Sequence, residues 1–191
     1  MNDTYKIAFI GSHGVGKTTL CYGLAARLKA ADFALEVVGE VARRCPLPIN
    51  RDTTLSAQTW ILHTQIAEEI LAASRGRVVI CDRSVLDNFV YLLIAAGHHA
   101  VPTLAQLVDA WIHSYDLLVR IPILEDPNPD GLRSTDPVFQ REVDARLLAE
   151  IDGRGLPVLD LTGVERNHWV DRVEVTALES LRPAQLSLPK R

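Results

Sequence analysis

The sequence has few cysteines and no long apolar run. Its three cysteines, Cys21, Cys45 and Cys81, are odd in number and lack the spacing of metal ligands, which argues against a disulfide framework or a zinc site. No apolar run is long enough to cross a bilayer, and residues 1–3 lead into a strand-like segment without a signal-peptide pattern. We therefore expect a soluble, cytoplasmic protein with reduced thiols.

The chain also has no excess of positive charge. Its 20 Lys and Arg residues are outnumbered by 24 Asp and Glu residues, which gives a net charge of −4. Such a chain has no general attraction for nucleic acid or an anionic membrane, so we expect neither as a partner. The composition, with 48% hydrophobic residues in 191, suits a single globular domain. We place this domain at residues 1–182 and a C-terminal tail at 183–191, and the sequence leaves the oligomeric state open.

Residues 11–18 match the phosphate-loop pattern G-x-x-x-x-G-K-[ST]. They stand between a strand-like run at 5–10 and a helix-like run that begins near Lys17, so a chance match in a glycine-rich turn is the weaker alternative. The glycines let successive backbone N–H groups face one anion, and the helix N-terminus adds partial positive charge. We predict a nucleoside-triphosphate site made by Gly11, Ser12, His13, Gly14, Val15, Gly16, Lys17, Thr18 and Thr19.

Three side chains of the phosphate loop have distinct predicted roles. Lys17 would reach the β and γ phosphates, Thr18 would hold Mg²⁺ through its hydroxyl, and Thr19 would contact the α-phosphate side. The sequence lacks the Asn-Lys-x-Asp element that guanine-specific phosphate-loop proteins usually carry. This absence favours ATP over GTP as the nucleotide.

A second predicted site follows the strand-like run at 77–82. Four apolar residues end there in Asp82, as expected for the strand that supports Mg²⁺ beside a phosphate loop, and the ion would be held through coordinated water. The alternative is an aspartate that merely caps a turn. Arg83 would stabilise the charge of the transferring phosphoryl group. Ser84 begins a capping box, which predicts a helix start rather than a nucleophile.

Glu40 follows the strand-like run at 34–39. Because ligands of open α/β sheets bind outside the carboxyl ends of the strands, Glu40 would lie on the same rim as the phosphate loop and contact the phosphate acceptor. The alternatives are a solvent-facing acid or an ion pair with Arg43 or Arg44. The Pro-rich loop at 43–52 adds Arg51, and its arginines either hold an anionic substrate group or are solvated.

Two further segments have features of a substrate site. Gln58, Gln65 and Glu69 form a stripe on the predicted helix 54–74, which could read a nucleobase or be an ordinary polar helix face. Residues 121–137 are rich in proline and acidic residues and are predicted to form a lid that excludes water. Arg133 is the first candidate for an arginine that the lid brings to the site, and Arg141 is the second. The alternative is that both side chains are solvated.

The order of elements predicts an α/β fold. It is a doubly wound, parallel, five-stranded sheet with helices on both faces and a lid segment. The predicted strands are residues 5–10, 34–39, 77–82, 116–120 and 156–161. The predicted helices begin at Lys17, Thr54, Ser84, Thr103, Asp136 and Thr162, and capping boxes at Ser84, Thr103 and Thr162 mark three of these starts.

With these motifs in order, the chain resembles the small phosphate-loop kinase-like ATPase family. The motifs are the phosphate loop, Glu40 to Arg43, Cys81 to Ser84 and Asp130 to Arg133. That family includes the ribosylnicotinamide kinase domain of the bacterial NAD-biosynthesis regulator. The element Asp82-Arg83-Ser84 is also similar to the Glu-Arg-Ser element of deoxynucleoside kinases.

The resemblance to deoxynucleoside kinases implies roles for three residues. In those kinases the acid of this element binds Mg²⁺, its arginine contacts phosphate, and a glutamate at the end of the second strand acts as base towards the sugar hydroxyl. The matching positions here are Asp82, Arg83 and Glu40. The loop after Glu40 lacks the tryptophan-containing pattern of those enzymes, which leaves the acceptor open.

The sequence thus predicts an ATP- and Mg²⁺-dependent phosphotransferase acting on a small hydroxyl acceptor, a nucleoside or nucleoside-like metabolite. Lys17, Glu40, Asp82, Arg83 and Arg133 are its predicted catalytic residues. Two alternatives remain. One is a regulatory ATPase that acts through a protein partner, and the other is a nucleotide kinase whose acceptor is a monophosphate held by the arginines of the loop at 43–52.

Overall fold

The computed structural model describes residues 4–97, 99, 101–125 and 136–185 of the chain. Five parallel strands form one sheet in the order β2-β3-β1-β4-β5. The strands are β1 (Tyr5–Ile10), β2 (Leu35–Val38), β3 (Val78–Asp82), β4 (Leu117–Arg120) and β5 (Leu159–Asp160). This is the predicted sheet, although the last strand is shorter than the predicted 156–161.

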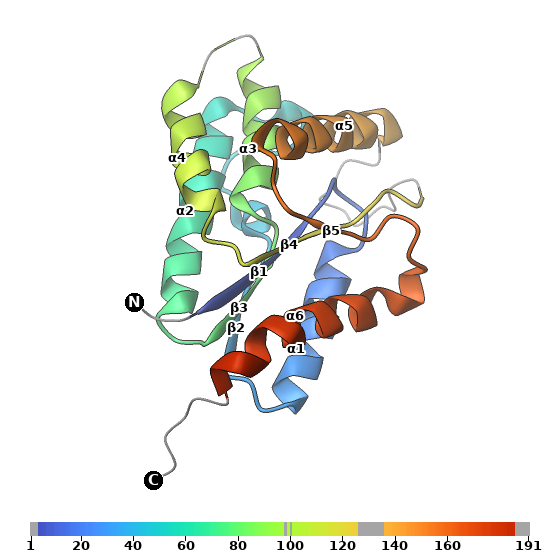
Figure 1. Cartoon of the computed structure of the whole chain (residues 1–191). Coiled ribbons are helices and arrows are strands. Elements are labelled where there is room, and N and C mark those ends of the chain that lie inside the picture. Colours follow the sequence, from blue (N-terminus) through green and yellow to red (C-terminus); the bar gives the residue numbers. More distant parts are fainter. Residues whose placement is uncertain (1–3, 98, 100, 126–135, 186–191) are drawn as a thin grey trace.

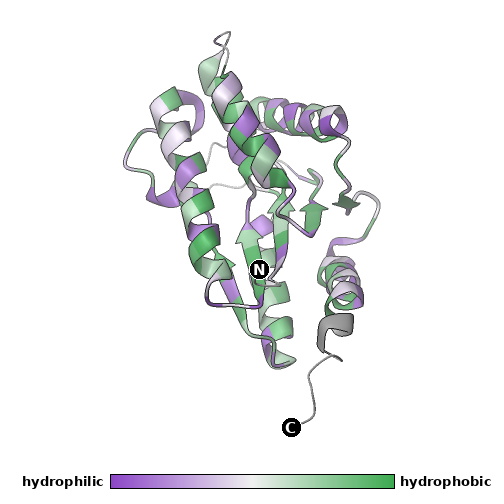
Figure 2. Cartoon of the chain, turned by 60° about the vertical axis from the view of Figure 1, so that its left-hand side comes forward, coloured by the Kyte–Doolittle hydropathy of each residue, from purple (hydrophilic) through white to green (hydrophobic). Residues whose placement is uncertain are grey.

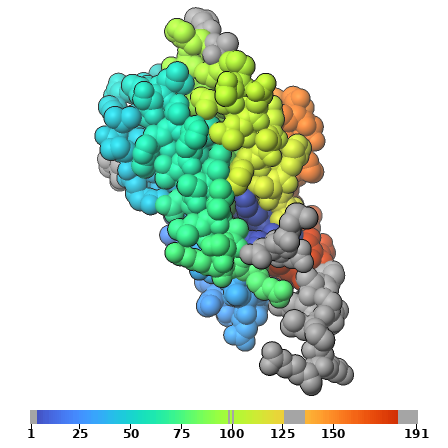
Figure 3. Space-filling model, turned by 90° about the vertical axis from the view of Figure 1, so that its left-hand side faces the viewer, coloured from blue at the N-terminus to red at the C-terminus, as the bar shows by residue number. Residues whose placement is uncertain are grey.

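Helices cover both faces of the sheet, as predicted for a doubly wound fold (Figure 1). On one face α1 (Lys17–Ala30) packs with α6 (Trp169–Gln185). On the other face lie α2 (Leu55–Ala73), α3 (Val85–Ala96), α4 (Pro102–Ile112) and α5 (Pro137–Arg154). The outer surface of this second layer is formed by α2 and α4 (Figure 3).

The central strand β1 is buried on both sides. Ile7 and Phe9 belong to the core beneath α1 and α6, while Ala8 and Ile10 belong to the core beneath the other helices. In Figure 2 the strands are largely hydrophobic, whereas the helices carry both hydrophobic and hydrophilic residues. Because β1 pairs with both β3 and β4, its carboxyl end lies between the ends of those strands. That end is where the phosphate loop begins.

Four predicted helix starts are confirmed and two are wrong. Helix α1 begins at Lys17, and the side chain of Thr54 caps α2. Ser84 and Asp87 form the capping box that opens α3, and the carboxylate of Asp136 caps α5. In contrast, α4 begins at Pro102 without a side-chain cap, so Thr103 does not start it. Thr162 does not start α6 either, because its hydroxyl accepts a hydrogen bond from Arg120 and a 3₁₀ turn precedes the helix.

Two parts of the predicted organisation lie largely outside the described residues. These are most of the lid, including Arg133, and residues 186–191 of the tail. Residues 183–185 continue the backbone of α6. Among the residues that are described, no helix combines the length and the apolar character needed to span a membrane.

Candidate active site

The phosphate loop joins the end of β1 to the start of α1. Gly11 has φ of 152°, and a Cβ on this residue would lie 2.8 Å from the carbonyl oxygen of Ile121. Gly16 has φ of 96° and is the residue immediately before α1. Both positions therefore require glycine, which lets the loop turn sharply and present the helix N-terminus to the rim of the sheet.

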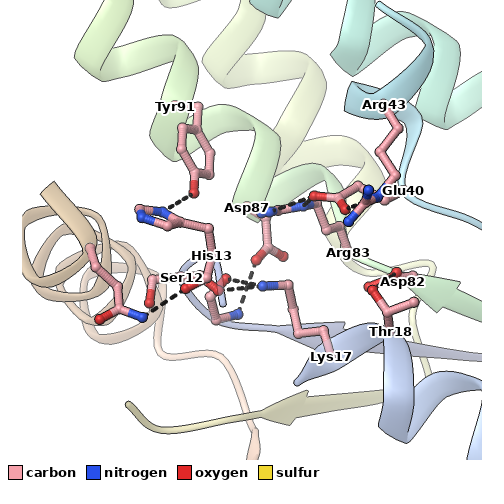
Figure 4. A network of polar contacts seen from close by, with 12 residues as sticks. Ser12, His13, Lys17, Thr18, Glu40, Arg43, Asp82, Arg83, Asp87 and Tyr91 are labelled. Carbon is pink, nitrogen blue, oxygen red and sulfur yellow. Dashed lines mark hydrogen bonds and ion pairs between the residues drawn. The ribbon is translucent and has the colours of Figure 1, made fainter. Parts of the chain in front are cut away.

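The side chain of Lys17 is buried against the phosphate loop. Its ammonium group donates hydrogen bonds to the carbonyl of Gly11, at 2.8 Å, and to that of Ser12 (Figure 4). Burial, with a smaller contribution from the positive charge of Arg83, lowers the pKa of Lys17 to about 7. The ammonium thus lies where an anion in the loop would restore its charged form.

Thr18 and Asp82 meet at the start of α1. The hydroxyl of Thr18 donates to Oδ2 of Asp82 at 2.6 Å, and the aspartate is only 1% exposed. Its other oxygen, Oδ1, is buried without a hydrogen-bond partner in the described part of the chain. A hydroxyl and one carboxylate are oxygen ligands of the kind that Mg²⁺ takes from proteins, so these residues fit the ion.

Glu40 lies between two arginines. Its Oε1 accepts from Nε of Arg83 at 2.8 Å and lies 2.8 Å from Nη2 of the same guanidinium, and its Oε2 accepts from Nε of Arg43 at 2.9 Å. Burial is the largest single effect and disfavours the charge of Arg83, but Glu40, Tyr91, Asp87 and Asp82 together outweigh it, so the pKa of Arg83 is raised. The structure thus forms the ion pair with Arg43 that the sequence left open, while Arg44 pairs with Glu68 instead.

A pocket opens beside the phosphate loop. It is lined by residues from the loop, the segment after β2, and helices α2 and α3: His13, Glu40, Ala42, Arg43, Ile49, Asn50, Gln58, Ile61, Arg83, Asn88 and Tyr91. Within the described residues, the buried amide nitrogen of Asn88 has no hydrogen-bond partner. A molecule in this pocket would touch the Glu40–Arg83 pair on one side and the loop on the other.

Helices α3 and α5 hold the phosphate loop in place. Oδ1 of Asp87 accepts from the backbone N–H of Gly11 at 3.0 Å, while its Oδ2 accepts from Ser84. The Tyr91 hydroxyl bonds the ring of His13 at 3.1 Å, and Gln140 of α5 donates to the His13 carbonyl at 2.8 Å. The sequence predicted a capping box at Ser84 but not the contact between Asp87 and Gly11, because these two residues lie far apart along the chain.

The structure therefore brings most of the predicted site residues to one rim of the sheet. The phosphate loop, Glu40, Asp82 and Arg83 meet there (Figure 4). Of the other arginines, Arg51 pairs with Asp136, Arg141 belongs to α5, and Arg133 is outside the described residues.

Several known proteins are similar to this chain. A thymidylate kinase of Psychrobacter sp. (strain PRwf-1) is 28% identical over 156 residues, which cover 71% of this chain and 74% of that protein. A deoxyadenosine kinase from M. mycoides, solved with dCMP and dCDP, has a TM-score of 0.62 at 14% identity and covers 92% of this chain and 99% of its own.

A third similar structure is the NadR protein in complex with NAD and AMP-PNP. Its TM-score is 0.69 at 16% identity, and the match covers 98% of this chain but 51% of NadR, so this chain spans about half of that protein. These likenesses confirm the phosphate-loop fold and the resemblance to phosphate-loop kinases that the sequence motifs indicated. Residues 6–172 match a family model described as an AAA domain. Because this match covers most of the chain, the protein belongs to that family of AAA domains.

Proposed function

We propose that the protein is an ATP- and Mg²⁺-dependent kinase that transfers the γ-phosphoryl group to a hydroxyl of a nucleoside or nucleoside-like metabolite. One observation carries this proposal: the pocket lined by Glu40 and Arg83 is also lined by His13 of the phosphate loop. An acceptor in the pocket would therefore lie beside the phosphates held by the loop. Transfer between two molecules requires this proximity.

The loop amides and Lys17 would hold the phosphates. Contact with the anionic phosphates would favour the charged form of Lys17, which burial alone disfavours. Thr18 and Asp82 would hold Mg²⁺, which supplies positive charge to the phosphate oxygens. Arg83 would add a buried cation near the transferring group. Since Arg83 is fixed by Glu40, it would need little reorganisation during the reaction.

Glu40 would orient the acceptor hydroxyl and take its proton. Both of its oxygens already accept hydrogen bonds from guanidinium groups, so the hydroxyl would share the carboxylate with Arg43 and Arg83. An ionised carboxylate has about four lone-pair positions, which leaves room for this further contact.

The relatives support an acceptor of the nucleoside or nucleotide class, since the deoxyadenosine kinase is named for a nucleoside and the thymidylate kinase for a nucleoside monophosphate. The arrangement of arginines favours a free alcohol over a monophosphate. Of the three arginines predicted as a phosphate clamp, only Arg43 lines the pocket, while Arg44 and Arg51 pair with Glu68 and Asp136. The pocket also favours a small acceptor over a regulatory ATPase, which needs none.

The test is ADP release from Mg·ATP with a panel of nucleosides, ribosylnicotinamide and their monophosphates. We expect one nucleoside-like alcohol to stimulate release and to yield a matching phosphorylated product. Lys17→Ala should lower turnover by at least about 100-fold, because it removes a cation from the transferring phosphoryl oxygens. Slow hydrolysis that no compound stimulates would contradict the proposal and favour the regulatory ATPase. Stimulation by monophosphates alone would favour the nucleotide kinase.

A further inference from the structure

The backbone of Arg83 is held in an unusual conformation. Its φ is 105°, a value that residues with a Cβ rarely adopt and that costs on the order of 1–3 kcal/mol. The residue lies in the short turn between the end of β3 and the start of α3. The surroundings of this turn must therefore stabilise it, and they determine where the guanidinium points.

Two buried side chains bond the turn on either side of Ser84. Nε2 of Gln65 donates to the backbone carbonyl of Arg83 at 3.4 Å. The hydroxyl of Tyr115 accepts from the backbone N–H of Val85 at 3.0 Å. Gln65 belongs to α2 and Tyr115 precedes β4, so the turn is held by elements far apart in the sequence.

Both side chains are oriented by one carboxylate, that of Glu69, which is fully buried. Oε1 of Glu69 accepts from the Tyr115 hydroxyl at 2.6 Å and from Nε2 of Gln65 at 2.9 Å. A tyrosine hydroxyl has a single hydrogen, so donation to Glu69 leaves its lone pairs for Val85. The Gln65 amide has two hydrogens, and both of its neighbours, Glu69 and Arg83, are acceptors. Glu69 therefore fixes the direction of both hydrogen bonds to the turn: Tyr115 accepts from Val85, and Gln65 donates to Arg83.

The second oxygen of Glu69 is held from the other side. Oε2 accepts from Nζ of Lys6 at 3.0 Å and from Nε1 of Trp111 at 2.8 Å. The Lys6 ammonium supplies the opposite charge that a buried carboxylate requires. This end of the network borders a surface groove between α2 and α4, on the face shown in Figure 3.

We propose that Gln65 and Tyr115, oriented by Glu69, are positioning residues for Arg83. None of the three lines the pocket beside the phosphate loop, so they act through the turn and not by contact with a substrate. The glutamine stripe of α2 thus divides: Gln58 lines the pocket, whereas Gln65 and Glu69 are buried in this network. The kinetic part of the inference rests on the proposed role of Arg83 in phosphoryl transfer.

Tyr115→Phe and Trp111→Phe form a matched pair of variants. Each removes one donor to the same buried carboxylate, and only the Tyr115 hydroxyl also bonds the turn. Hydrogen exchange of the Val85 amide measures the turn directly and needs no enzymatic activity. We expect Tyr115→Phe to speed this exchange by at least about tenfold and Trp111→Phe by less than about threefold.

Kinetic measurements should distinguish Tyr115→Phe from Trp111→Phe in the same way. Because Arg83 is assigned to the transition state, Tyr115→Phe should lower kcat by about tenfold or more with KM for ATP within about twofold, while Trp111→Phe leaves both nearly unchanged. Equal effects of the two variants on exchange would overturn the inference, since the residues would then serve stability alone.

The exchange comparison keeps this inference distinguishable from the proposed function. If the wild-type protein transfers no phosphate to any acceptor, the proposed function fails, and the Val85 amide still decides whether Tyr115 holds the turn. Should Tyr115→Phe not fold, Gln65→Met replaces it, because it keeps the side-chain length and removes the contact with the Arg83 carbonyl. Unchanged exchange of the turn in Gln65→Met would overturn the inference equally.

Discussion

The ammonium group of Lys17 shows how burial changes the chemistry of one residue. Lys17 is 3% exposed, and its pKa falls to about 7 from an ordinary value of about 10.4. The nearby carboxylates of Asp82, Asp87 and Glu40 oppose this shift but do not cancel it. The folded protein therefore holds this proton less tightly than the unfolded chain does.

This difference predicts a pH dependence of stability. Between about pH 7 and pH 10 the unfolded chain binds more protons at Lys17 than the folded protein, so the contribution of this group to the free energy of unfolding rises with pH. The destabilising effect is fully present below about pH 7. Urea unfolding of the nucleotide-free protein should show that the stability of wild type relative to Lys17→Met increases from about pH 7 to pH 9.5.

Lys29→Met is the control for this experiment, since Lys29 is an exposed lysine on the same helix. Its stability relative to wild type should not change over the window. A flat difference for Lys17→Met as well would mean that the ammonium is not desolvated in the free protein.

At the scale of elements, the start of α3 supports the phosphate loop. The carboxylate of Asp87 closes the capping box with Ser84 through one oxygen and accepts the Gly11 amide through the other. One side chain therefore joins the helix start to the first residue of the loop. Loss of a helix cap and loss of the loop contact can be separated by mutation.

Ser84→Ala should cost about 1 kcal/mol of stability, as the loss of an N-cap usually does, and leave ATP affinity within about twofold. Asp87→Ala should in addition weaken ATP binding by about tenfold or more, because the buried Gly11 amide loses its partner. Urea unfolding and ATP titration of both variants measure the two effects. If both variants bind ATP equally well, Asp87 does not shape the loop.

Helix starts show where sequence reasoning succeeded and where it failed. The capping box at Ser84 was predictable because both of its partners are local. The pattern at Thr162 is as good by sequence, but the Thr162 hydroxyl bonds Arg120, which lies far away along the chain. At Thr103 the preceding Pro102 starts the helix instead, as its fixed φ allows at a first helical position.

In the candidate site, too, some features were predictable from the sequence and others were not. Motif spacing predicted that the phosphate loop, Asp82 and Glu40 would share one rim, because the carboxyl ends of parallel strands meet there. The Glu40–Arg83 ion pair, the Asp87–Gly11 contact and the network of Glu69 join residues distant in sequence. Nothing in the local pattern encodes such contacts, and the roles assigned to these residues await the experiments above.

At the scale of the whole molecule, the proposed site couples nucleotide binding to stability. A ligand at about 100 times its Kd adds about 2.7 kcal/mol, and a domain of this size gains roughly 2–4 °C in Tm per kcal/mol. Mg·ATP should therefore raise Tm by about 5–10 °C.

Removal of Mg²⁺ with EDTA should reduce this shift, since Asp82 and Thr18 would then face ATP without the bridging charge. Thermal unfolding with ATP, with Mg·ATP and with Mg²⁺ alone provides the comparison. An equal Tm with and without the ion in the presence of ATP would contradict the assignment of these two residues as ligands.

The central position of β1 also affects how the protein is made. This strand is synthesised before both of its partners in the sheet, residues 78–82 and 117–120. Until both have emerged, β1 exposes at least one edge with unpaired backbone groups. A nascent chain that ends before Leu117 therefore contains the whole phosphate-loop motif but lacks the complete sheet from which the loop projects.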